Sequence, residues 1–176
     1  MSNMSRLTAT LTLVLGLTHV AAAPQHPAMP VGMSHAEHLA QMEKDAALKQ
    51  RGASAMGFDQ DKATHHFRLD RTGGAIEVVA NDPTDGPFQQ QIRAHLESIA
   101  KEFAAGDFGK PLETHAELPP GTRTMTQQRR ALAFVYEELP GGGRVRITAS
   151  NAKAIDAVHQ FLRYQIREHK TGDAMK

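Results

Sequence analysis

The sequence predicts an α+β fold, a two-layer sandwich in which two helices cover one face of a four-stranded antiparallel sheet. The main observation is a repeated order of strand, turn, strand and helix, first over residues 64–106 and again over residues 131–172. In both stretches apolar residues alternate over the two short segments and recur at helical spacing in the long one. Each ββα unit then has an apolar sheet face and an apolar helix stripe to bury. We expect residues 64–172 to form one duplicated domain, preceded by an N-terminal helix at residues 34–52.

The first residues, 1–23, are predicted to be a secretory signal peptide. They contain one cation, Arg6, then a short apolar run over residues 7–20 and three alanines at 21–23. This is the layout of a cleaved signal, and the apolar run is too short to span a bilayer. We therefore expect a periplasmic protein with no membrane span after cleavage. Residues 24–33 contain three prolines and are expected to form a mobile leader.

The composition argues against several classes of function. Removing Arg6 leaves 19 of the 20 lysines and arginines, against 19 aspartates and glutamates. Such a neutral balance disfavours nucleic acid as a partner, because nucleic acid selects a basic surface. The chain has no cysteine, so it has neither a disulfide nor a thiolate metal ligand.

The N-terminal helix is predicted from its two ends. Ser34 and Glu37 have the spacing of a capping box, and Gly52 suits the left-handed position that ends a helix. Its apolar stripe is thin and consists of Leu39, Met42 and Ala46. We expect this helix to dock weakly or to need a partner.

The first ββα unit begins with a hairpin whose alternation directs His65, Phe67 and Leu69 to the core. We expect a four-residue loop over 71–74, which would pair Phe67 with Val78 and Arg68 with Glu77. In the following helix, Asp85 is the expected N-cap, Pro87 lies in the first turn and Gly106 ends it. Its apolar stripe is Phe88, Ile92, Leu96, Ile99 and Phe103. Residues 107–121 are expected to be a proline-rich crossover.

In the second unit the turn over 140–143 is expected to pair two alternating segments. One directs Leu132, Phe134 and Tyr136 inward, and the other directs Val145, Ile147 and Ala149. Ser150 or Asn151 is the expected cap of the last helix, and Gly172 its end. The buried stripe of that helix should be Ile155, Val158, Leu162, Ile166 and His169. We expect one core cluster of Phe67, Val78, Leu96, Phe134, Ile147 and Leu162, with Phe134 at its centre.

Histidine and methionine are frequent and cluster towards the N-terminus. Nine histidines and six methionines follow the signal segment. His35, His38 and Met42 are three and four residues apart, so on a helix they lie on one side within reach of one ion. Imidazole and thioether donors together favour copper over calcium or structural zinc. The alternative is that these residues are ordinary surface and core side chains.

His65 and His66 are a second candidate group. Neighbours on a regular strand point to opposite faces, so both can bind one metal only if a bulge redirects one of them. A structural role for His65 under the helices is the alternative. His95 and His159 occupy similar places in their helices and could form a pair, or could each be a half-buried boundary residue.

Two short motifs do not support their usual functions. The glycines at 141–143 lack the Lys-Ser/Thr of a phosphate loop and lie in a hairpin. Thr122-Arg123-Thr124 is similar to part of the aspartate carbamoyltransferase signature, but the match is three residues long and the chain is too short for that enzyme.

Two segments, GFDQDKATHHF at 57–67 and FLRYQIREHKTGD at 161–173, carry a wider resemblance. They resemble a family of small exported bacterial proteins of unknown activity, some of which carry a carbamoyltransferase label without its motif. The resemblance covers most of the chain from Met33 onward. It implies a folded, exported protein and supplies no catalytic residues.

These observations lead to three functional hypotheses. The first is a periplasmic copper-binding protein that buffers or delivers the ion, with His35, His38, Met42, His65 and His66 as candidate ligands. The second is a non-catalytic module that binds another periplasmic protein or a second copy of itself through the sheet and the N-terminal helix. The third is an enzyme that uses the His65/His66 region.

Overall fold

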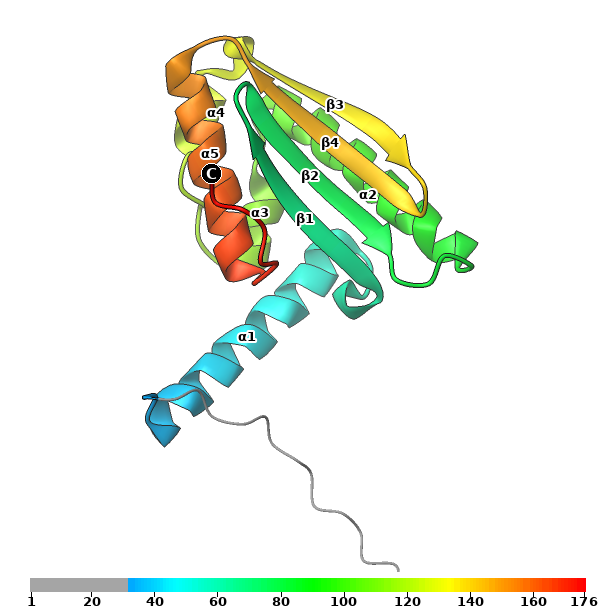
Figure 1. The fold of residues 1–176 in the computed structure, drawn as a ribbon, viewed down its shortest axis with the longest axis vertical. Helices are drawn as coiled ribbons and strands as arrows, with labels where there is room; N and C mark the ends of the chain where they lie inside the picture. The colour runs from blue at the N-terminus through cyan, green and yellow to red at the C-terminus, as the bar shows by residue number, and fades with distance from the viewer. Residues whose placement is uncertain (1–31) are drawn as a thin grey trace, which may run out of the picture.

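The computed structural model describes residues 32–176, so the predicted signal peptide and most of the leader lie outside the described residues. The chain forms the expected α+β fold, with two strand–strand–helix units and a preceding helix (Figure 1). The helices and strands, in chain order, are α1 (His35–Met56), η1 (Gln60–Lys62), β1 (Ala63–Asp70), β2 (Gly73–Ala80), α2 (Gly86–Ala105), α3 (Gly109–His115), α4 (Thr122–Gln127), η2 (Arg129–Ala131), β3 (Leu132–Leu139), β4 (Gly142–Ala149) and α5 (Ala152–Glu168).

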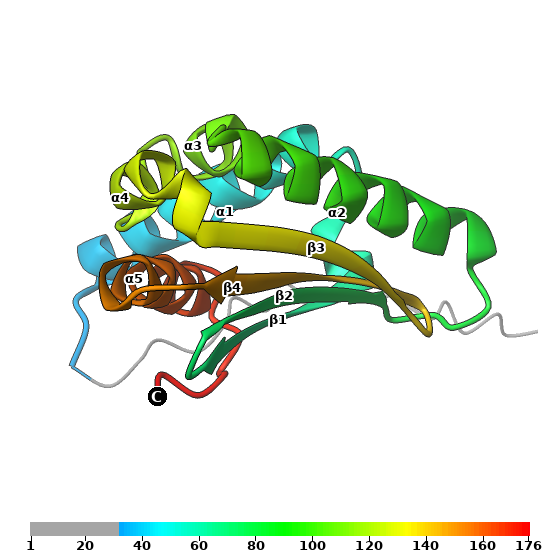
Figure 2. The same ribbon diagram turned by 90° about the horizontal axis from the view of Figure 1, so that it is seen from above.

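The four strands form one antiparallel sheet in the order β1-β2-β4-β3, so the two hairpins lie side by side and β1 and β3 form its edges. The buried stripes of α2 and α5 join the inward side chains of all four strands in one hydrophobic cluster. Figure 2 shows α2 running along one side of the sheet. The two-layer prediction is therefore confirmed for the described residues.

The first hairpin is tighter than the sequence suggested. Its turn is the two-residue Arg71–Thr72 segment, where the Asp70 carboxylate accepts hydrogen bonds from the Thr72 amide at 2.7 Å and hydroxyl at 2.8 Å. Phe67 consequently pairs with Ile76 and not with Val78, so the predicted register was wrong by two residues. A two-residue shift keeps every side chain on its expected face. The expected Arg68–Glu77 ion pair still forms, diagonally, at 2.9 Å.

This tight turn places Gly74 inside β2, where a side chain has no room. Its φ is +156°, and a Cβ atom there would lie 2.1 Å from the Arg68 carbonyl oxygen and 2.5 Å from Leu162 Cδ1. We expect Gly74→Ala to lower the free energy of unfolding by about 2–3 kcal/mol, because the strand and α5 must both shift. Denaturant unfolding measures this loss. Gly86→Ala is the control, because a Cβ there has no heavy atom within 4 Å; equal effects would contradict the assigned hairpin geometry.

The second hairpin and its helix follow the prediction more closely. Phe134 pairs with Ile147 and Tyr136 with Val145, around a turn at residues 140–141. Asn151 caps α5, because its side chain accepts a hydrogen bond from the Ala154 amide at 2.9 Å. The helix ends at Glu168 and not at Gly172, since Lys170 already adopts a left-handed backbone conformation with φ +51°.

The structure adds one local feature to the prediction and corrects another. The expected crossover over residues 107–121 contains α3 and leads into α4, and the buried Phe108 fixes the start of α3 to the core. The N-terminal helix continues past Gly52 to Met56 and ends at Gly57, whose φ is +76°. Gly52 is buried inside this helix because the Gln60 side chain packs against it, and a Cβ there would lie 2.0 Å from Gln60 Nε2.

The centre of the core lies between α2, α5 and the sheet. Five of the six predicted core residues are buried, whereas Phe134 is only half-buried because it lies on the edge strand β3. The centre is Phe103, which is 2% exposed. Its ring contacts those of Phe108, Phe134 and Phe161, with centroid distances of 4.5, 5.7 and 5.8 Å.

Candidate histidine-lined site

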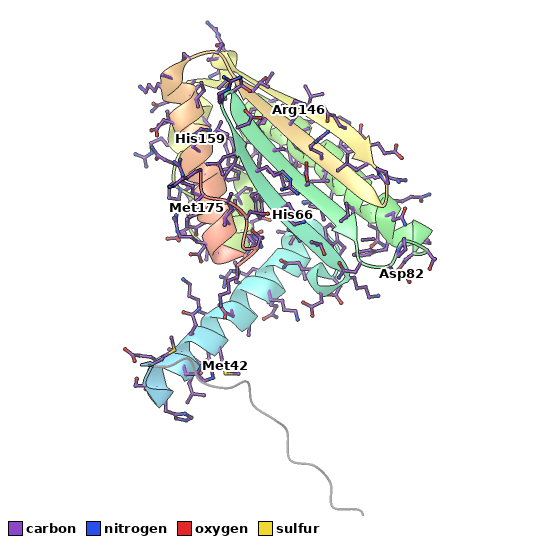
Figure 3. The ribbon with its side chains drawn as sticks, in the orientation of Figure 1. Met42, His66, Asp82, Arg146, His159 and Met175 are labelled. Atoms are coloured by element: carbon purple, nitrogen blue, oxygen red, sulfur yellow. The ribbon has the colours of Figure 1, made fainter. Side chains whose placement is uncertain are left out.

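The predicted ligands His35, His38 and Met42 lie in the N-terminal half of α1, which extends beyond the rest of the fold (Figure 1). His35 and Met42 are exposed and His38 is half-buried. The Nε2 atom of His38 is shielded from solvent and has no hydrogen-bond partner in the described part of the chain. Figure 3 shows Met42 near the outer end of α1, far from His66 on the sheet. The structure therefore separates this group from His65 and His66.

His65 and His66 point to opposite faces of β1, as the strand alternation predicted. His66 Nδ1 is 2.9 Å from Asp173 Oδ1, and the other carboxylate oxygen accepts a hydrogen bond from the Phe67 amide at 2.9 Å. Burial alone would raise the pKa of Asp173, but the hydrogen bonds from Phe67, Thr171 and His66 outweigh it and lower that pKa. The pairing of His66 fixes the C-terminal tail to the edge of β1.

His65 faces the other way, into a cavity of about 70 Å³ beneath the sheet. Four imidazoles border this cavity, and they come from β1, α2, α3 and the residue that ends α5. The last residue of α1 and one residue of α5 add a thioether and an amide. These six polar or sulfur-containing residues are His65, His95, His115, His169, Met56 and Gln165.

The rings of this group are close together. His169 lies between two of the others, with its centroid 5.9 Å from that of His65 and 5.2 Å from that of His115. His65 and His169 are nearly parallel, with an angle of 17° between their planes. Phe58 packs against two of these imidazoles, with its ring 6.5 Å from that of His65 and 5.6 Å from that of His95.

Three buried polar atoms at this cavity have no hydrogen-bond partner among residues 32–176. They are His65 Nε2, His115 Nδ1 and Gln165 Nε2. The other nitrogen of His115 is 3.0 Å from Gln165 Oε1; because an amide oxygen only accepts, this Nε2 carries the proton and Nδ1 keeps a free lone pair. Buried polar groups nearly always have partners, and each unsatisfied one costs about 1–3 kcal/mol. Three such atoms around one cavity indicate a site for a ligand or water.

The cavity also keeps its histidines uncharged at neutral pH. Burial, together with the neighbouring histidines and, for His95, with Lys110, lowers the pKa of His65 and of His95 to about 4 and that of His169 to about 3. Burial likewise lowers the pKa of His115, although its bond to Gln165 acts in the opposite direction. A neutral imidazole has the lone pair that a metal ion or a hydrogen-bond donor requires.

His65 and His169 also border an outer hollow of about 340 Å³, on the side of α1 and the C-terminal tail. The rest of its lining is largely polar and includes Lys49, Gln60 and Thr171. The two stacked imidazoles therefore stand between the inner cavity and the surface. A ligand that enters from this side meets His65 and His169 first.

Of the five predicted copper ligands, only His65 borders this cavity. His169 was predicted to lie on the buried stripe of the last helix; it is half-buried, one residue past the end of α5, and its position near His65 was not predicted. His95 borders the cavity, whereas His159 lies beside the first hairpin turn, with its Nε2 atom 2.8 Å from the Asp70 carbonyl oxygen. The available signal was that His65 and His169 occur in the two segments that carried the resemblance. His115 and Met56 had no such signal.

The geometry limits what the site can hold. Within residues 32–176, no group of three or more His, Cys, Asp or Glu side chains is placed to hold a metal ion.

None of the helices in this part of the chain is long and apolar enough to cross a bilayer.

No protein-family model, curated protein or solved structure matches the chain. The described residues form a two-layer α+β protein of two ββα units with a histidine-lined cavity under the sheet.

Proposed function

We propose that the protein binds one copper ion, as Cu(I), in the histidine-lined cavity, and that it buffers or delivers this ion in the periplasm. The observation that carries the proposal is the pair of unpartnered imidazole nitrogens, His65 Nε2 and His115 Nδ1, at a cavity that Met56 also borders. The periplasmic location rests on the signal-like composition of residues 1–23.

The size of the cavity favours an ion over an organic ligand. Its volume is about 70 Å³, whereas pockets for small organic molecules are typically about 300–1,000 Å³. A bound water needs about 10–15 Å³ on the same kind of measure. The space therefore suits a metal ion with at most a few waters.

The charge and softness of the lining favour Cu(I) over divalent ions. The donors are neutral imidazoles and a thioether. Among the described residues no carboxylate borders the cavity, and the charged side chain there is the cation Lys110. A buried divalent ion without a compensating anion is strongly disfavoured. A singly charged ion is disfavoured much less, and thioether ligands select Cu(I).

The ring positions are compatible with two imidazoles on one ion. Metal–nitrogen bonds of about 2 Å place the centres of two such rings roughly 5 Å apart. The distances from His169 to His65 and to His115, 5.9 and 5.2 Å, are close to this value. We expect His65, His169 and Met56 to form the site, since Cu(I) accepts two or three ligands where zinc requires four.

Competition titration with a coloured Cu(I) chelator, under reducing conditions, tests the proposal. We expect His65→Phe, His169→Phe and Met56→Leu each to weaken Cu(I) binding at least about tenfold. Each substitution removes one metal-binding atom and puts an apolar side chain of similar size in its place. His159→Gln is the matched control, since His159 lies outside the cavity. Unchanged affinity in all three cavity variants would contradict the cavity site.

The same titration addresses the predicted site on α1. If His35, His38 and Met42 bind copper, their alanine variants should lose affinity while the cavity variants do not. If both sets of variants lose affinity, the protein binds two ions, which the stoichiometry would show.

A second candidate function has one observation in its favour. Leu39 and Met42 are 47% and 37% exposed on the extended half of α1, which suits a helix that docks onto another protein. The expectation is that Leu39→Ala weakens such docking and leaves Cu(I) affinity unchanged. Pull-down with the wild type and this variant, alongside the titration, separates the two functions.

A further inference from the structure

The two edges of the sheet differ in how they are protected. On β1, the Phe67 amide donates to Asp173, so the C-terminal tail covers part of that edge. On β3, the Leu132 amide donates to the Arg129 carbonyl at the start of the strand, and from residue 133 to residue 139 no hydrogen bond from any described segment other than β4 reaches the strand backbone. The ladder between β3 and β4 is continuous over all eight residues of Leu132–Leu139, with no bulge. The β3 edge is therefore regular and open.

The sequence of β3 lacks the usual protection of an edge strand. Edge strands commonly contain lysine, proline or a bulge that prevents pairing with another chain, and Leu132–Leu139 has none of these. Its two carboxylates are bound within the chain, Glu137 to Arg144 and Arg146 and Glu138 to Arg93. The middle of the strand presents Val135, which is 51% exposed. An open, regular edge of this kind is a template for pairing with another strand.

We propose that β3 pairs antiparallel with β3 of a second copy of this chain, about a two-fold axis through Val135, to form one continuous sheet. Figure 1 shows β3 along the outer margin of the sheet, where a second copy can approach. A two-fold interface requires a surface that is complementary to itself.

The register follows from the residues of β3. Residues directly opposite each other must share a face, so the axis must pass through a residue and not between two. An axis through Val135 places Phe134 opposite Tyr136 of the second copy on the inner face. On the outer face it places Val135 opposite itself. An axis through Tyr136 would instead set Val135 against Glu137, and an axis through Glu137 would set two carboxylates together.

A disulfide test exploits the absence of cysteine from the chain. Residues directly opposite in an antiparallel pair have Cα atoms about 4.5–5.5 Å apart, within the range of a disulfide. We expect Val135→Cys to form a covalent dimer under mild oxidation. Ala133→Cys is the matched control: it lies on the same face, but the two copies of residue 133 would be offset by four residues, roughly 13 Å. Equal cross-linking of the two variants, or none, would overturn the proposal.

Sedimentation equilibrium over a wide range of protein concentration provides an independent test. A strand edge alone buries less than a standard interface of about 1,600 Å², so we expect a reversible dimer. Val135→Lys and Val135→Glu should each raise the dissociation constant at least about tenfold, because like charges would meet at the axis. An equimolar mixture of the two should restore dimerisation. A wild type that stays monomeric, or a Val135→Lys variant that dimerises as well as the wild type, would refute the β3 interface.

Discussion

The metal-free protein should lose a large part of its stability as the pH falls from about 6.5 to 4. In an unfolded chain an imidazole titrates near 6.5, whereas burial lowers the pKa of His65 and His95 to about 4 and that of His169 to about 3 in the fold. Between these pH values the unfolded chain binds more protons than the folded protein does, so acid favours unfolding. One such imidazole contributes on the order of 3 kcal/mol by pH 4, since one pKa unit is about 1.4 kcal/mol.

Urea unfolding at several pH values measures this loss. His169→Phe should reduce the slope of stability against pH by about 1.4 kcal/mol per pH unit between pH 4 and 6, because one proton fewer is taken up on unfolding. His35→Gln is the control, since His35 is exposed at the outer end of α1. A carboxylate with a lowered pKa, such as Asp173, loses its contribution only below about pH 4, so the two effects separate. The same slope in wild type and His169→Phe would show that His169 is not buried as described.

Truncating Phe103 should be the most damaging single change in the core. The side chain is 2% exposed and joins α2 to the rings of Phe108, Phe134 and Phe161. We expect Phe103→Ala to lower the free energy of unfolding by about 3–5 kcal/mol, from lost burial and the cavity it leaves. Denaturant unfolding at pH 7 measures this, and the loss is a large fraction of the total stability of a typical domain.

Two comparisons make this prediction specific. Phe134→Ala should cost less than Phe103→Ala, because Phe134 is only half-buried on the edge strand. Leu118→Ala should change stability by less than about 0.5 kcal/mol, since Leu118 is 53% exposed. If Phe134→Ala proved the more damaging of the two ring truncations, the core would be centred on β3, as the sequence alone suggested.

The sequence by itself determined the fold class, the order of strands and helix in both ββα units, and which face of each strand is buried. These features depend on local periodicity: alternation fixes which side of a strand is buried, and a spacing of three and four residues fixes a helix stripe. All five residues of the predicted α2 stripe are buried, and Asp85 and Gly106 bound that helix as expected. His65 and His66 face opposite ways for the same local reason.

Only the tertiary structure decided the hairpin register, the end of α1 and the composition of the site. The turn at Arg71–Thr72 is short because Asp70 closes it, and Gly52 lies inside α1 because Gln60 packs against it. The cavity joins His65, His115 and His169, which are up to 104 residues apart in the chain numbering. No local sequence pattern predicts that these three residues line one cavity, because their proximity depends on how the elements that carry them pack together.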